Sequence, residues 1–297
     1  MESLLEELQT PKTDLDQFGK LTVRILQYIP AVLSQYKSKN NYRIYSSTSA
    51  GTTKYVRPIN QSLFTFEPND FEVKLKSLLK TLDRIKAGEK EFTKEDKNNI
   101  NATLYTIQQS IGAGFDLLSS PNAARKHVGN RFEELIRATF THIGVSNKRT
   151  VLKIPYETEE GTKIYKCEND LILSPFDEVK SSSTSLDINE VVVSVKTTSK
   201  DRMGKMFIDK LLLEEFVKHP QKVIGIFLND VQRKGSDNIS YTLVSGLFMV
   251  YTKFLTQLEG IYYLDPPPNA SKLPYSNHMN SFSELLTSDL LEDLLSS

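Results

Sequence analysis

The sequence has little cysteine and no tryptophan. Its one cysteine, Cys167, cannot form a disulfide within the chain, which excludes a disulfide-stabilised scaffold and favours a reducing compartment, the cytoplasm. One cysteine and four scattered histidines also exclude a Cys/His zinc cluster. No apolar run approaches the ~20 residues needed to span a bilayer, and the N-terminus has no signal-peptide pattern, so no membrane contact is expected.

An excess of charge of one sign is also missing. Lys plus Arg and Asp plus Glu both total 37, so the formal net charge is zero. A protein that coats nucleic acid without preference is usually basic throughout, so any contact with nucleic acid must use a local basic surface. The 297 residues are enough for one large or two modest globular domains.

The first segment, residues 1–122, has apolar residues at helical spacing and is predicted to be a helical region. It contains three main helices, the third of which begins near a capping-box pattern at Thr93 to Asp96. The polar stretch 39–67 predicts a long loop or a short hairpin.

The second segment, residues 123–265, alternates helical and β-type patterns. A helix is predicted at 123–143 and another at 202–218. The predicted strands are 150–155, 162–167, 169–173, 190–196, 223–228 and 240–251. This order predicts an α/β fold with a mixed central sheet flanked by helices. The third segment, residues 266–297, begins as a proline-rich linker and ends in a short acidic helix.

The residues most suited to chemistry are Asp170 and Lys196. Asp170 stands at the head of an apolar strand, and Lys196 ends the hydrophobic run that begins at Val191. The separation of 26 residues is enough for neighbouring strands of one sheet. A carboxylate and an ammonium brought together there can hold a divalent metal and orient a water. Hydrolysis of a phosphodiester requires both of these functions.

These residues resemble the PD-(D/E)xK nuclease superfamily, the fold of many type II restriction endonucleases. In that pattern an Asp heads one strand, and an acid and a Lys two positions later lie on the next. Asp170 and Lys196 match, but Ser194 stands where the acid is expected. A variant group that cuts CCGG- and CCNGG-type sites has Ser-x-Lys and takes its carboxylate from the following helix, about 13 residues past the Lys. Asp209 stands at that position.

The same group carries a charged triplet shortly after the lysine, which reads base edges. Lys200, Asp201 and Arg202 stand at those offsets, with Lys where Arg is commoner. Arg and Lys suit guanine O6 and N7, and Asp accepts from cytosine N4. The triplet can also be read as the polar first turn of the 202–218 helix. Similarly, Asp209 with Lys205 four residues earlier can be an ordinary helical ion pair.

The family also places a Glu on the helix before the sheet, often as Gly-x-x-hydrophobic-Glu. The segment from Gly129 to Glu133 fits this pattern, and Glu134 is a weaker alternative one position away. The resemblance therefore assigns metal binding to Glu133, Asp170 and Asp209, with Lys196 also catalytic.

The resemblance implies a type II restriction endonuclease that uses Mg²⁺ to cut both strands of duplex DNA and leave 5′-phosphate ends. A palindromic site calls for a two-fold protein, so a homodimer is expected. Residues 1–122 are then expected to clamp DNA, to contact flanking bases or to build the dimer. The alternatives are a structure-specific or repair nuclease of the same fold, or a DNA-binding protein without catalysis.

Overall fold

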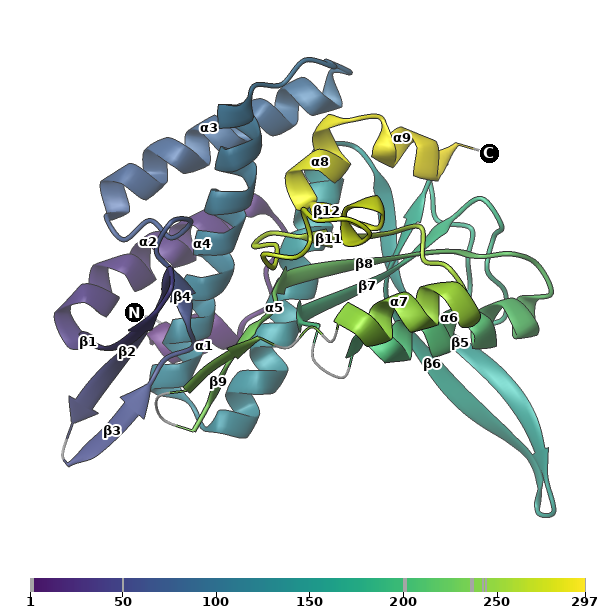
Figure 1. Ribbon diagram of the computed structural model, residues 1–297, viewed down its shortest axis with the longest axis horizontal. Coiled ribbons are helices and arrows are strands. Elements are labelled where there is room, and N and C mark those ends of the chain that lie inside the picture. Colours follow the sequence, from purple (N-terminus) through teal and green to yellow (C-terminus); the bar gives the residue numbers. More distant parts are fainter. Residues whose placement is uncertain are drawn as a thin grey trace.

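The structure is a computed structural model, and its central element is a six-stranded β-sheet (Figure 1). The strands of this sheet are β5 (Ser146–Thr158), β6 (Gly161–Ser174), β7 (Val191–Thr198), β8 (Lys222–Asn229), β11 (Gly260–Tyr263) and β12 (Met279–Ser281). The described residues are 3–49, 51–199, 202–235, 238–241, 243 and 245–296.

The strands run in the order β12, β11, β8, β7, β6 and β5. From β12 to β7 the neighbours pair in parallel, whereas β6 pairs antiparallel with both β7 and β5. The sheet is therefore mixed, as predicted. Leu171 of β6 lies opposite Val193 of β7, so the two strands that carry Asp170 and Lys196 are direct neighbours.

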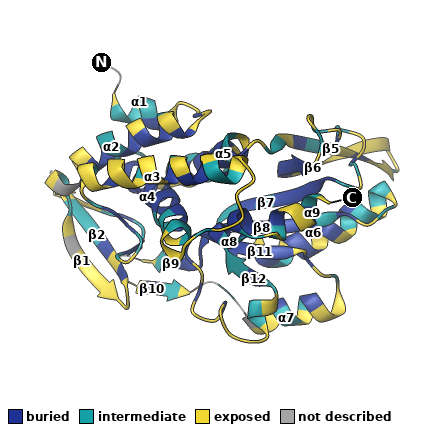
Figure 2. Ribbon diagram, turned by 90° about the horizontal axis from the view of Figure 1, so that it is seen from above, coloured by how far each residue is buried: buried dark blue, intermediate teal, exposed yellow. Residues whose placement is uncertain are grey.

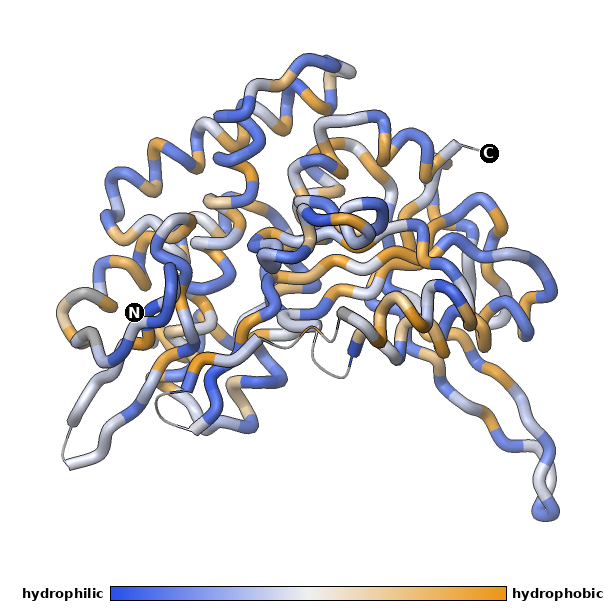
Figure 3. The backbone as a smooth tube through the Cα atoms, viewed as in Figure 1, coloured by the Kyte–Doolittle hydropathy of each residue, from blue (hydrophilic) through white to orange (hydrophobic). Residues whose placement is uncertain are grey.

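Both faces of the middle strands are buried. Val191, Val193 and Val195 point into a core shared with the N-terminal helices, whereas Val192 points into a second core on the other face. Strands covered on both sides are apolar throughout, which explains the continuous hydrophobic run of β7. Figure 3 shows hydrophobic residues following the central strands and hydrophilic residues at the tip of the β5–β6 hairpin.

Two helices cover the faces of the sheet. Helix α5 (Pro121–His142) contributes Phe132 to the first core, and α6 (Arg202–Val217) contributes Phe207 to the second. The helices predicted at 123–143 and 202–218 are thus confirmed. Among the described residues, none of the helices is long and apolar enough to cross a membrane.

The strand predicted over 240–251 is wrong. The chain forms the short hairpin of β9 (Val231–Lys234) and β10 (Asn238–Tyr241), and then helix α7 (Ser245–Phe254). Phe248 and Thr252 of α7 are buried four residues apart, which is a helical spacing. A short apolar run does not by itself distinguish a buried strand from a helix, because both are rich in hydrophobic residues.

The N-terminal region is mainly helical, as predicted. Its helices are α1 (Leu4–Gln9), α2 (Leu15–Val32), α3 (Pro68–Lys86) and α4 (Lys94–Leu118). Helix α4 lies at the centre of this region and packs against α2, α3 and α5. Most of its residues are buried, so it connects the N-terminal helices with the helix that covers the sheet.

A small sheet occupies most of the stretch predicted as a loop or a short hairpin. Its strands are β1 (Ser34–Lys39), β2 (Tyr42–Ser49), β3 (Thr52–Tyr55) and β4 (Ile59–Asn60). In β2 only Tyr42 and Ile44 are buried, so the alternating apolar pattern that predicts a strand is too short to recognise.

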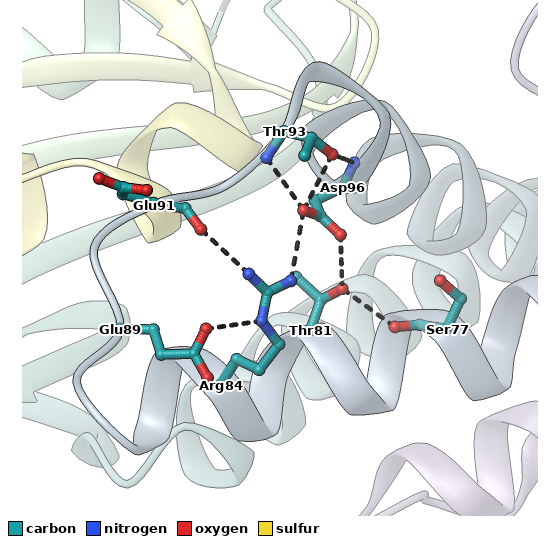
Figure 4. A network of polar contacts seen from close by, with 7 residues as sticks. All are labelled: Ser77, Thr81, Arg84, Glu89, Glu91, Thr93 and Asp96. Atoms are coloured by element: carbon teal, nitrogen blue, oxygen red, sulfur yellow. Dashed lines mark hydrogen bonds and ion pairs between the residues drawn. The ribbon is translucent and has the colours of Figure 1, made fainter.

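The start of α4 is joined to the end of α3 by a polar network (Figure 4). Thr93 and Asp96 form a complete capping box, as the sequence predicts. The Asp96 carboxylate also accepts from Thr81 and Arg84, at 3.4 and 3.3 Å. The cap therefore begins α4 and, through Asp96, also holds α4 against α3.

The tail is more ordered than a linker with one short acidic helix. It contains the 3₁₀ turn η1 (Tyr275–Asn277), strand β12, and the helices α8 (Phe282–Thr287) and α9 (Leu290–Leu295). Phe282 and Leu291 are buried in the same core as the N-terminal helices, and Figure 2 shows the buried residues running through the molecule. All three predicted segments therefore contribute to one hydrophobic core.

Candidate active site

Asp170 and Lys196 meet across the neighbouring strands β6 and β7. The Lys196 ammonium donates to Asp170 Oδ2, and the backbone N–H of Val195 donates to the same oxygen at 2.8 Å. Asp170 is only 8% exposed, whereas the Lys196 side chain keeps 25% of its surface accessible. The carboxylate is therefore fixed in place, and the ammonium beside it is open to a ligand.

This ion pair lies in a cavity of about 290 Å³ between the two strands and helix α6. The charged residues that line it are Lys166, Glu168, Asp170, Lys196, Arg202, Lys205 and Asp209. Ser194 lines the same cavity and lies opposite Gly225 of β8, so the side chains at this register are small. The structure thus brings the strand residues and the helix residues of the predicted site to one place.

Glu133 approaches the ion pair from α5. The pKa of Glu133 is raised to about 7, chiefly by burial and then by the negative charge of Asp170, while the positive charges of Lys196 and Arg149 oppose the shift. A second carboxylate close to Asp170 concentrates negative charge at a place where a cation is stabilised. Glu133 therefore belongs electrostatically to the Asp170 site.

The neighbouring Glu134 has different partners. Its carboxylate accepts from the backbone N–H of Lys12 at 2.8 Å and pairs with Arg131 at 2.9 Å. Arg131 also donates to the carbonyl of Thr10 at 2.6 Å. Glu134 thus holds the N-terminal segment against α5, and of the two candidates it is Glu133 that interacts with Asp170.

Asp209 lies on α6 and forms the ion pair that the sequence left open as an alternative. Lys205 Nζ lies 2.6 Å from Asp209 Oδ1. Both side chains line the cavity, so the pair sits across it from Asp170 and is not an isolated surface contact. Within the described ranges, no three His, Cys, Asp or Glu side chains gather closely enough to form a ready metal cluster.

The donor set nevertheless suits a hard divalent cation. Mg²⁺ prefers carboxylate oxygens and keeps several waters, so it needs only one or two direct protein ligands. Asp170 and Asp209 line one cavity, and Glu133 interacts with Asp170. Asp170 and Asp209 fit such an ion because both supply carboxylate oxygens to one cavity, and a bound cation would favour the ionised form of Glu133.

Of the predicted base-reading triplet, Lys200 and Asp201 lie outside the described residues. Arg202 begins α6, is exposed and lines the cavity. The cavity is also lined by Tyr165 and Lys166, which the sequence did not single out. Both lie on β6 a few residues before Asp170, and no spacing rule distinguishes them from the other residues of a long hairpin.

No family model matches the sequence, and no curated protein matches it. Among solved structures, the chain is similar to the type IIP restriction endonuclease Kpn2I, with a TM-score of 0.68 and 17% identity over 94% of this chain and 91% of that chain. The chain has the restriction-endonuclease-like fold. A second similar structure is the restriction endonuclease PspGI in complex with substrate DNA, with a TM-score of 0.43 and 11% identity over 75% of this chain and 92% of that one.

The restriction-endonuclease-like fold confirms the fold class that the residue pattern implied. The order of the sheet places β6 and β7 side by side, with α6 next in the chain. The cavity that holds Asp170 and Lys196 is formed by these three consecutive elements.

Proposed function

We propose that this protein is a type II restriction endonuclease that cuts both strands of duplex DNA at a specific site. The observation that carries the proposal is the Asp170–Lys196 pair, which is fixed by the Val195 backbone and faces a cavity with further charged residues. A carboxylate and a partly exposed ammonium on adjacent strands suit the hydrolysis of a phosphodiester.

Asp170, Asp209 and Glu133 would hold Mg²⁺, directly or through water. When bound, Mg²⁺ supplies charge stabilisation for the scissile phosphate and lowers the pKa of a bound water. Lys196 orients or deprotonates the attacking water and stabilises the negative charge that develops on the phosphate. In-line attack on phosphorus then releases a 5′-phosphate and a 3′-hydroxyl.

Arg202, together with Lys200 and Asp201, is proposed to read base edges in the major groove. Arg202 suits this role because it is exposed at the start of α6 and lines the cavity. A guanidinium can donate two hydrogen bonds to guanine O6 and N7. We propose a homodimer, since two-fold related subunits present one cavity to each strand of a palindromic site.

The test is digestion of phage and plasmid DNA with purified protein, with and without Mg²⁺. The wild-type protein should give discrete fragments only with the metal. Lys196→Ala should lower the cleavage rate by roughly 10²–10⁴-fold while binding of DNA in the absence of metal is kept. Sequencing the fragment ends then gives the site and the polarity of the cut.

The matched control is Lys20→Ala, which removes an exposed lysine of α2 whose ammonium pairs with Asp16. This variant should cut like the wild type. Cleavage only at branched or nicked DNA would overturn site-specific restriction in favour of a structure-specific or repair nuclease. Binding without any cleavage, unchanged in Lys196→Ala, would indicate a DNA-binding protein without catalysis.

A further inference from the structure

The outer surface of α6 and α7 is unusually apolar. Of the fifteen large hydrophobic residues that are exposed in the described ranges, six lie on these two helices or directly after them. They are Ile208, Leu211, Leu247, Val250, Phe254 and Leu255, and we call them the α6–α7 face. The two helices pack together through Phe207, whose ring centroid lies 5.5 Å from that of Tyr251.

The exposed residues of α7 form a regular stripe. Leu247, Val250 and Phe254 are spaced i, i+3 and i+7, which places them on one side of the helix. Phe248 and Thr252 lie on the opposite side and are buried against the protein. Because both sides of α7 are apolar, the helix has the pattern of one that is covered on both sides.

The face is mainly apolar, and the exposed lysines beside its α6 residues are paired with carboxylates, Lys205 with Asp209 and Lys218 with Glu215, which argues against DNA as its occupant. Lys253 is the one basic residue of α7, and its ammonium lies 5.4 Å from the centre of the Phe254 ring. A surface that binds DNA needs several cations to neutralise phosphates. An apolar surface of this kind instead suits another apolar protein surface.

The size of the face suits a second copy of the chain. Phe254 is 71% exposed and Ile208 is 59% exposed. Together the six side chains expose on the order of 500 Å², against the ~800 Å² that each partner buries in a standard interface. A two-fold axis through the face would bring the α7 stripe of one copy against that of the other, and an apolar stripe is complementary to itself.

We propose that the α6–α7 face is the two-fold interface of a homodimer. The choice of a second copy as the occupant rests on the proposed function, since a cut in both strands needs two cavities. Helix α6 carries Asp209 towards the cavity and Ile208 towards the face, so one rigid helix sets each cavity relative to the axis. The interface would therefore fix the separation of the two cuts.

The first test is the molar mass in solution, measured by light scattering on the full chain without DNA. The chain weighs 33.8 kDa, and the wild type should have twice this mass. Val250→Glu and Phe254→Glu should each raise the dimer dissociation constant by at least ~100-fold, because each would bury an unpaired charge. The matched control is Val73→Glu on α3, which changes a residue that is 68% exposed outside the face and should leave the dimer intact.

The second test uses a cross-link and does not depend on disrupting the face. Cys167 is 2% exposed, so a cysteine placed by Val250→Cys would be the reactive one. Mild oxidation should then join two chains through residue 250, and Val73→Cys should stay monomeric on a denaturing gel. A wild type that is monomeric at micromolar concentration, glutamate variants that remain dimeric, or no cross-link at residue 250 would each overturn the proposal.

The experiments distinguish a failure of the proposed interface from a failure of the proposed nuclease function. If the glutamate variants dissociate the dimer but the wild type cuts no DNA, the proposed interface stands and the proposed function is refuted. If the wild type and Phe254→Glu cut both strands equally well, the proposed function stands and the proposed interface is refuted. If both hold, Phe254→Glu should accumulate nicked plasmid where the wild type produces linear plasmid.

Discussion

Asp170 and Asp265 are two buried carboxylates at the central sheet. The side-chain partner of Asp170 is charged, whereas those of Asp265 are neutral. Asp170 faces the ammonium of Lys196 beside a cavity. Asp265, two residues after β11, accepts from the Tyr42 hydroxyl and the Asn60 side-chain amide, each at 2.9 Å. Burial raises the pKa of Asp265 to about 6, and these two hydrogen bonds oppose the shift.

The difference separates the proposed active site from a structural junction. At Asp170 the compensating charge is the partly exposed ammonium of Lys196, so a ligand can compete for the carboxylate. At Asp265 the partners are neutral, and they belong to the small N-terminal sheet, more than 200 residues earlier in the chain. Asp265 thus fastens the N-terminal region to the central sheet, whereas Asp170 is available for chemistry.

The largest expected effect is on Asp170, and it concerns activity. In Asp170→Asn the remaining side-chain oxygen can still accept from the backbone of Val195, so the fold is kept, but the negative charge is lost. Metal-dependent cleavage should fall by roughly 10²–10⁴-fold, measured as the rate of plasmid linearisation. A change in the thermal midpoint without a change in rate would instead make Asp170 structural, like Asp265.

The next effect is on stability and depends on pH through Asp265. Between about pH 4 and 6 the folded protein keeps a proton on Asp265 that the unfolded chain has released. Raising the pH through this window therefore lowers the free energy of unfolding, by up to about 3 kcal/mol from this group alone.

This contribution can be isolated with Asp265→Asn, which cannot titrate. Urea unfolding of the variant and the wild type is compared at pH 4 and at pH 8. The stability of the variant relative to the wild type should increase by up to about 3 kcal/mol at the higher pH. A difference that is equal at both pH values would show that the pKa of Asp265 is the same in the folded and the unfolded protein.

A smaller effect is expected when the junction loses one hydrogen bond. Tyr42→Phe removes the hydroxyl that donates to Asp265 and should destabilise the protein by about 1–3 kcal/mol. The loss should be larger at pH 8 than at pH 4, since the ionised carboxylate needs the donor more. Tyr45→Phe removes a half-buried hydroxyl that bonds Gln61 at 3.0 Å and should show no such pH dependence.

The smallest effect concerns a region that belongs to neither site. Thr93→Ala removes the cap of α4 and one contact of the network in Figure 4, and should cost about 1 kcal/mol. The cleavage rate should be unchanged at a temperature where the variant is folded. Reduced cleavage by the folded variant would show that the packing of α3 on α4 affects the geometry of the cavity.

The two carboxylates also differ in how far their partners could be predicted from the sequence. Asp170 and Lys196 are 26 residues apart, on strands with clear apolar runs, so their meeting could be predicted from spacing. The capping box at Thr93 is likewise local. Sites built from neighbouring strands or from one helical turn can be predicted, because their residues stand at characteristic spacings in the sequence.

The rest depends on contacts that no local pattern contains. Nothing near Asp265 in the sequence indicates Tyr42 or Asn60, because tertiary packing alone brings them together. The strands β1–β4 are mostly exposed and polar, and α7 has an apolar run that fits two structures. The roles of Glu133, Asp209 and Arg202 at the cavity stay predictions until they are tested by substitution.

The position of β12 at the edge of the sheet has a consequence for synthesis of the protein. This strand pairs in parallel with β11, and the helices after it bury Phe282 and Leu291 against the N-terminal helices. A ribosome translates them only after Asp170, Lys196 and Asp209. Until then the edge of β11 has no partner, and an open edge of this kind is prone to aggregate. The growing chain therefore contains every proposed catalytic group before it contains the last strand of the sheet.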